Sequence, residues 1–196
     1  MTESKQKRRL QIVGAASEVF AEKGYHSASI NDIIEKAKIA RGTFYLYFTG
    51  KHNVLEAILD DVLERLRQRI KGVEVGPDAP PPGEQLRSNI IRIIRFATEE
   101  RTVVRIVLEH GLAPDDQVAE RVQRFWRHVA EMIEASLTQG IALGIVRKCD
   151  VKINAAASLG AIRGVVEYLV EDEGEPDLAK VAAEVIGFAM RGVIKS

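Results

Sequence analysis

Residues 29–51, SINDIIEKAKIARGTFYLYFTGK, constrain the fold of this chain more than any other stretch. Ser29 is followed three residues later by Asp32, a capping-box pattern that predicts the start of a helix. After a short break, a second helical segment is expected over 41–48, and Lys51 begins a third. Two short helices joined by a tight turn can place the second helix in the major groove of DNA. The stretch therefore predicts a helix-turn-helix.

Helical periodicity continues through the rest of the chain, and no window shows the sustained alternation of a half-buried strand. Proline and glycine concentrate in GVEVGPDAPPPG at 72–83 and in GLAPDD at 111–116, which predicts two loops. The expected fold class is all-α. The remaining helices are expected at about 5–23, 51–71, 84–98, 99–110, 115–142, 151–170 and 177–194.

The balanced net charge of the chain hides an asymmetry. Residues 1–52 hold nine Lys and Arg against five Asp and Glu, whereas the remainder holds nineteen against twenty-three. A basic first quarter on an acidic body suggests an end that binds a polyanion, although chance scatter of surface charge gives the same count. The basic run Lys5, Lys7, Arg8 and Arg9 could reach a minor groove or phosphates, or could be a solvated, frayed tail.

The single cysteine, Cys149, cannot form an intramolecular disulfide, which favours a reducing compartment. The N-terminus lacks the apolar core of a signal peptide, and no stretch of about 18 uncharged apolar residues suggests a membrane span. The expected location is the cytoplasm, without contact to a membrane.

The segment 41–48 divides into two faces when it is projected at about 100° per residue. One face holds Phe44 and Phe48, which are expected to be buried. The opposite arc holds Gly42, Thr43, Leu46 and Tyr47, and Arg41 and Lys51 flank it. These groups can contact base edges, thymine methyl groups and phosphates. In the alternative interpretation, Tyr45 and Tyr47 only pack against the core with their hydroxyls exposed.

Residues 9–55 resemble the N-terminal DNA-binding domain of the tetracycline-repressor (TetR) family of transcriptional regulators. The residues that carry the resemblance are Ala15, Ala16, Phe20 to Tyr25, Ser29, Ile30, Asp32, Ile33, Arg41 to Tyr45, Tyr47, Phe48 and Lys51. The resemblance implies a homodimer whose two recognition helices bind successive major grooves of a palindromic operator. It also implies a helix-turn-helix domain at 1–50 and a helical effector-binding and dimerisation domain at 51–196, whose small-molecule ligand usually releases the DNA.

The matched positions assign the residues that contact DNA. They are Ser29, Arg41, Gly42, Thr43, Tyr45, Leu46, Tyr47 and Lys51, with Lys51 expected to hold a phosphate and Ser29 to present its helix to the DNA backbone. The chain departs from the family in the turn, where Lys38 replaces the usual glycine and Ala40 replaces serine or threonine. A left-handed Lys38 would be mildly strained, and Ala40 cannot cap the next helix.

The last two helices are apolar around most of their circumference, so each needs two partners. One face can pack within the chain, and the other is expected to meet a second copy. Small residues allow close helix approach, although they also suit a tight monomer core. The expected dimer-interface residues are Ala156, Gly160, Gly164, Gly187 and Met190.

A ligand cavity among the C-terminal helices would be lined by large apolar side chains. The candidates are Phe96, Phe125, Trp126, Val129 and Met132, and ordinary core packing is the alternative for most of them. Their apolar character favours a hydrophobic or aromatic effector.

An enzyme is not expected. The four histidines show neither i, i+4 pairing nor proximity to Cys149, so no metal site and no cofactor are predicted. The sequence thus predicts a ligand-responsive DNA-binding regulator, and a repressor in particular. The alternatives are a non-specific architectural DNA-binding protein without an effector, and a helical small-molecule-binding protein.

Overall fold

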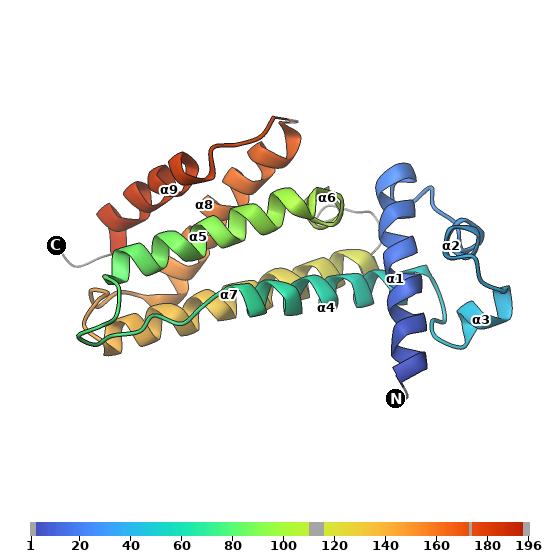
Figure 1. Ribbon diagram of the computed structural model, residues 1–196, viewed down its shortest axis with the longest axis horizontal. Helices are drawn as coiled ribbons and strands as arrows, with labels where there is room; N and C mark the ends of the chain where they lie inside the picture. Colours follow the sequence, from blue (N-terminus) through green and yellow to red (C-terminus); the bar gives the residue numbers. More distant parts are fainter. Residues whose placement is uncertain (1–2, 110–115, 173, 194–196) are drawn as a thin grey trace. The chain divides into compact units, whose positions relative to one another are not determined.

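The computed structural model describes residues 3–109, 116–172 and 174–193. All regular elements in these ranges are α-helices, which confirms the all-α fold class (Figure 1). The helices are α1 (Glu3–Lys23), α2 (Ile30–Ala37), α3 (Arg41–Tyr45), α4 (Lys51–Arg69), α5 (Pro82–Glu99), α6 (Arg101–Glu109), α7 (Asp116–Ala142), α8 (Val151–Glu171) and α9 (Leu178–Val193).

The helices group into two compact units. The first comprises Met1–Glu64 and Arg101–Phe125, and the second comprises Arg65–Glu100 and Trp126–Ser196. The chain passes between the units within α4, between α5 and α6, and within α7. The functional division between residues 50 and 51 stays a prediction, because the grouping by contacts assigns the first part of α4 and all of α6 to the same unit as α1.

The first unit is built on the apolar face of α1, which packs against α2 and α6 (Figure 1). Ile12, Ala16 and Phe20 recur every four residues along α1 and are almost completely buried. Each large side chain buried in this way contributes about 1.5–3 kcal/mol relative to an exposed one. Gly24, at φ 75°, lies just beyond the end of α1. Glycine is the residue that most often occupies the left-handed position just after a helix.

The second unit places α5 against both α8 and α9 (Figure 1). Asp150 caps α8 by accepting a hydrogen bond from the backbone N–H of Ile153 at 3.0 Å, and the half-buried Cys149 immediately precedes this cap. Buried apolar residues of α5, α8 and α9 form the core: Ile94, Ala97, Ala155, Val166, Leu169, Val170 and Ala182.

Large apolar side chains remain on the outer surface of α8 and α9. Ile153 is 67% exposed, Tyr168 68% and Phe188 74%. Helix α8 is also long and apolar enough to cross a membrane, with a mean hydropathy of 1.2. This is weak evidence for a membrane span, because core helices pass the same test and α8 packs on α5 and α9.

Candidate nucleic-acid interface

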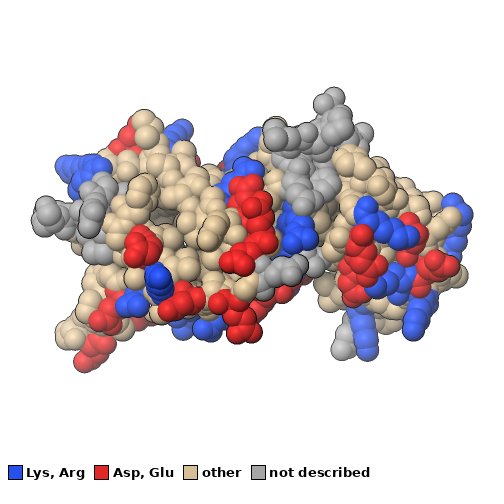
Figure 2. All heavy atoms as spheres, turned by 90° about the horizontal axis from the view of Figure 1, so that it is seen from above, with Lys and Arg blue, Asp and Glu red and all other residues tan. Residues whose placement is uncertain are grey.

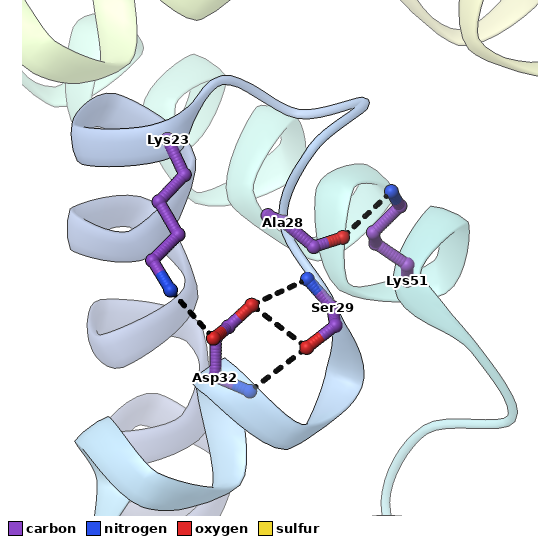
Figure 3. Close-up of polar contacts among 5 residues, drawn as sticks. All are labelled: Lys23, Ala28, Ser29, Asp32 and Lys51. Atoms are coloured by element: carbon purple, nitrogen blue, oxygen red, sulfur yellow. Dashed lines mark hydrogen bonds and ion pairs between the residues drawn. The ribbon is translucent and has the colours of Figure 1, made fainter.

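Helix α2 begins with the capping box that the sequence predicted (Figure 3). The Ser29 hydroxyl oxygen accepts from the backbone N–H of Asp32 at 3.2 Å and donates to the Asp32 carboxylate at 2.7 Å. The same carboxylate oxygen accepts from the backbone N–H of Ser29 at 2.8 Å. The reciprocal bonds satisfy N–H groups that a helix start otherwise leaves without partners.

Ion pairs hold α2 against α1. Lys23 Nζ lies 2.6 Å from Asp32 Oδ1, and Lys36 Nζ lies 2.9 Å from Glu18 and 2.7 Å from Glu22. Figure 2 shows basic and acidic side chains interleaved over this part of the molecule. Exposed pairs of this kind contribute little individually, about 0–1 kcal/mol, so they support the packing of α2 without dominating it.

The pKa of Asp32 is lowered, first by its hydrogen bond to Lys23 and then by those from Ser29. A carboxyl group with a lowered folded-state pKa contributes stability above its unfolded pKa, and this stability is lost as the pH falls toward the folded value. Asp32→Asn should therefore be less stable than the wild type near pH 7, and the difference should shrink below about pH 4. Urea unfolding across this range measures it, with the exposed Asp60→Asn on α4 as the matched control. A constant difference down to acid pH would refute the explanation.

The turn after α2 has the strained geometry expected at Lys38. Lys38 has φ 51° and ψ 50°, and it is the one non-glycine residue with positive φ among those the structure describes. Its N–H donates to Glu35 O at 3.1 Å, and the N–H of Ile39 donates to Ile34 O at 3.2 Å. These two bonds form a Schellman motif, in which glycine usually occupies the left-handed position.

Replacing Lys38 with glycine should relieve this strain and raise the free energy of unfolding by up to about 1 kcal/mol. The gain is smaller than the full strain because glycine also makes the unfolded chain more flexible. Glu35→Gly, an exposed position inside α2, is the control and should lower stability by about 1 kcal/mol. Denaturant unfolding of both variants measures the two effects. A loss of stability in Lys38→Gly would contradict the assignment of strain.

Helix α1 also fixes the end of α2, through a contact that sequence reasoning missed. Gln11 Nε2 donates to the carbonyl oxygen of Ala37 at 2.7 Å, and Gln11 Oε1 accepts from Arg8 Nη1 at 2.7 Å. Arg8 and Gln11 are 3 residues apart, a spacing that brings side chains together on one helix. Gln11 and Ala37 are 26 residues apart, so no local sequence pattern could predict their contact. Residues 4–9 are helical in α1, and Lys5, Lys7 and Arg8 are exposed, so the basic run is solvated and regular. Its contact with DNA stays a prediction.

Helix α3 lacks a side-chain cap at Ala40, as the sequence predicted. It ends at Tyr45, so the expected end at Phe48 is wrong by three residues. The chain tightens there because the N–H of Tyr47 donates to Phe44 O, three residues back, at 3.0 Å. The tightened turn leads toward the start of α4.

The two faces of residues 41–48, the recognition segment, are separated as expected. Phe44 and Phe48 are buried with ring centroids 6.0 Å apart, and the Arg9 guanidinium lies 5.4 Å from the Phe48 ring centroid. Leu46 is 82% and Tyr45 47% exposed. Of the other candidate DNA-binding residues, Ser29, Arg41 and Gly42 are exposed, and Thr43, Tyr47 and Lys51 are half-buried. All eight candidates belong to the first compact unit.

Lys51, which was expected to hold a phosphate, is half-buried and has partners within the first unit. Its ammonium group donates to the carbonyl oxygens of Tyr25 at 2.6 Å, His26 at 3.1 Å and Ala28 at 2.9 Å. It also lies 4.5 Å from the centroid of the Tyr25 ring. The phosphate contact of Lys51 stays a prediction, and no local sequence signal indicated the three carbonyl partners.

Two parts of the chain match known protein families. Residues 12–58 match the family of bacterial regulatory proteins, tetR family, and residues 79–193 match the tetracyclin repressor-like C-terminal domain. The chain belongs to the TetR family. It is a DNA-binding transcriptional regulator of that family, which confirms the resemblance seen in the sequence.

Individual TetR-family proteins are similar over nearly the whole chain. The fatty acid metabolism regulator protein of Bacillus subtilis is 24% identical over 96% of this chain and 98% of its own. The structure of the B. subtilis regulator FadR with stearoyl-CoA has a TM-score of 0.77 at 24% identity, covering 93% of this chain and 98% of that one. A SmeT–triclosan complex has a TM-score of 0.82 at 24% identity, covering 97% and 93%. At this identity, the structural likeness establishes the fold.

The candidate ligand-binding residues are divided between the two units. Phe125 is buried in the first unit, whereas Phe96, Trp126, Val129 and Met132 belong to the second. Phe96 is buried, with the Arg69 guanidinium 4.6 Å from its ring centroid. The half-buried Trp126 has the Arg163 guanidinium 5.0 Å from its ring. Cationic groups therefore lie against two of the predicted aromatic residues.

An open recess of about 300 Å³ lies elsewhere, in the first unit. It contains none of the five ligand candidates, and its lining is Arg9, Tyr47, Phe48, Thr49, Asn53, Glu56, Ala57 and Asp60. Glu56 pairs with Arg124 at 3.1 Å and Arg121 at 3.6 Å, so its charge is compensated within the unit.

The predicted dimer residues lie on α8 and α9. Ala156, Gly160, Gly164 and Gly187 are exposed in the single chain, while the side chain of Met190 lies outside the described residues. The exposed small residues share their helices with the exposed Ile153, Tyr168 and Phe188.

Proposed function

We propose that this TetR-family regulator is a cytoplasmic repressor that binds a palindromic operator as a homodimer and is released by a small hydrophobic or aromatic effector. The observation that carries the proposal is the division of the recognition segment. Phe44 and Phe48 are buried on the inner face of residues 41–48. Gly42, Thr43, Tyr45, Leu46 and Tyr47 remain available to contact the major groove, and Arg41 at the start of α3 is placed for a phosphate contact. Ser29 at the start of α2 is the candidate for a contact to the DNA backbone.

The homodimer is supported by the outer surface of α8 and α9. Large apolar side chains exposed together on two helices, beside glycines and alanines that allow close approach, suit a helix-helix interface. A two-fold symmetric dimer would present two recognition helices to two half-sites about 34–36 Å apart, which is the reason for expecting a palindrome.

The effector class is supported by the aromatic residues of the second unit and by two related proteins. The B. subtilis FadR complex contains stearoyl-CoA and the SmeT complex contains triclosan, and both ligands have large apolar parts. The cationic groups of Arg69 and Arg163 beside Phe96 and Trp126 would also tolerate an anionic group on the effector.

Selection from random DNA duplexes tests the proposed function. We expect an enriched palindrome whose affinity falls steeply with salt, because phosphate neutralisation releases counterions. Thr43→Ala should change the preferred base at one position of each half-site, with a discrimination loss of about 1–3 kcal/mol. Binding without any enriched palindrome would favour the architectural alternative, and absence of binding at low salt would favour the helical small-molecule-binding protein.

Release by an effector has a built-in reporter. Trp126 is the single tryptophan of the chain and lies among the ligand candidates. A compound that both changes its fluorescence and lowers operator affinity would support the proposed mechanism. Tight binding of such a compound with unchanged operator affinity would reject it.

A further inference from the structure

We infer that Lys51 is a positioning residue of the DNA-binding site, whose ammonium group fixes the loop before α2 instead of binding a phosphate. The inference rests on the proposed DNA-binding function and changes the role expected for one of its residues. It starts from the geometry around Lys51 Nζ.

A lysine ammonium group has three N–H donors. Three backbone carbonyl oxygens lie within hydrogen-bond distance of Lys51 Nζ: Tyr25 at 2.6 Å, Ala28 at 2.9 Å and His26 at 3.1 Å. Figure 3 shows the bond to Ala28 beside the capping box of α2. All three donors are therefore matched by acceptors of the same loop, and a phosphate would have to displace at least one of them.

The loop is a favourable place for a positive charge. It follows the C-terminus of α1, where the partial charge of a helix is negative. The Tyr25 ring, with its centroid 4.5 Å from Nζ, adds a cation–π contact. That ring is itself 97% buried and packs edge-to-face on Phe20 at 5.1 Å, so it does not move independently of the core. The lysine thus joins α4 to a rigid part of the unit.

The position of the loop decides where α2 starts. The carbonyl of Ala28 belongs to the peptide unit that leads directly into Ser29, the N-cap of α2. Helix α2 then carries the Lys38 turn and α3. By donating to the Ala28 carbonyl, Lys51 positions the first residue of α2 relative to the first residue of α4. Because α2 leads through the Lys38 turn into α3, this bond also helps to position residues 41–48.

Salt dependence separates this role from a phosphate contact. Lys51→Met keeps the aliphatic stem and removes the ammonium group. We expect it to weaken operator binding about tenfold or more at fixed salt, while the slope of log K against log [salt] stays that of the wild type. Arg41→Gln, at the exposed start of α3, is the phosphate control and should reduce the magnitude of the slope by about 0.9.

Lys51→Arg completes the comparison. Arginine binds phosphate well, but its planar guanidinium cannot direct three donors to carbonyl oxygens arranged around one nitrogen. We expect operator affinity to stay at least about threefold below wild type in this variant. Full rescue by arginine, unchanged affinity in Lys51→Met, or a slope reduced by about 0.9 in Lys51→Met would each overturn the inference.

Lysine acetylation of the wild-type protein tests the same inference without requiring any variant to fold. Acetylation of lysines by N-hydroxysuccinimidyl acetate, followed by mass spectrometry, reports the accessibility of each ammonium group. Lys51 should react at least about tenfold more slowly than the exposed Lys38 without DNA, and operator should change its rate less than about twofold. Rapid reaction of Lys51 without DNA and strong protection by operator would overturn the inference. Failure of the wild type to bind any duplex would instead overturn the proposed function, and slow acetylation of Lys51 would still be observed.

Discussion

Phe44→Ala is expected to lower the free energy of unfolding by about 3–5 kcal/mol and to abolish operator binding at moderate protein concentration. Phe44 is completely buried in the first compact unit. Its ring lies 6.0 Å from Phe48 and 5.4 Å from Tyr45, centroid to centroid, so truncation leaves a cavity directly behind the recognition segment. A five-residue helix without a side-chain cap has few other interactions to keep its shape.

The neighbouring Tyr45→Ala is the matched control for Phe44→Ala. Tyr45 is 47% exposed, so its removal should change stability by less than about 1 kcal/mol while still weakening operator binding. Denaturant unfolding and operator titration of both variants give the comparison. Equal loss of stability in the two variants would contradict the separation of α3 into an inner and an outer face.

Phe188→Asp is expected to convert the proposed dimer into monomers and to weaken operator binding by about 10²–10⁴-fold. Phe188 is 74% exposed on α9 in the single chain. An aspartate there would bring an unpaired charge into an interface that the exposed Ile153 and Tyr168 make apolar. Loss of the dimer would remove the second half-site contact, because each recognition helix would then have to bind alone.

Arg95→Asp on α5 is the control for Phe188→Asp, because it places an aspartate at another exposed position of the second unit with an even larger change of charge. Sedimentation analysis gives the oligomeric state, and titration of the selected operator gives the affinity. A dimer that persists with wild-type operator affinity in Phe188→Asp would reject the proposed interface. Dissociation of both variants would show a general effect of negative charge instead.

Local signals in the sequence predicted the ends of several elements well. The Ser29–Asp32 capping box and the uncapped Ala40 each depend on residues within a few positions of one another. The end of α3 could not be predicted in the same way. Its apolar periodicity runs through Phe48, but the backbone tightens after Tyr45 to lead into α4, and tertiary structure decides that bend.

At the candidate DNA-binding site, the partners of Lys51 could not be predicted from the sequence either. Its place at a helix start is evident from the sequence, but its carbonyl partners are 23–26 residues away in a loop. The ligand candidates show a related limit, since periodicity identifies large apolar side chains without distinguishing a core from a cavity wall. Phe125 and Trp126 are adjacent in the sequence and nevertheless fall in different compact units.

The half-buried Cys149, next to the N-cap of α8, makes this protein suitable for distance spectroscopy without mutagenesis. It is the single thiol of the chain, so a spin label attached to it is stoichiometric. In a two-fold symmetric dimer, two such labels give one inter-subunit distance, whereas a monomer gives none. The same distance, recorded with operator and then with effector, would show whether the two Cys149 positions move relative to one another in the proposed dimer.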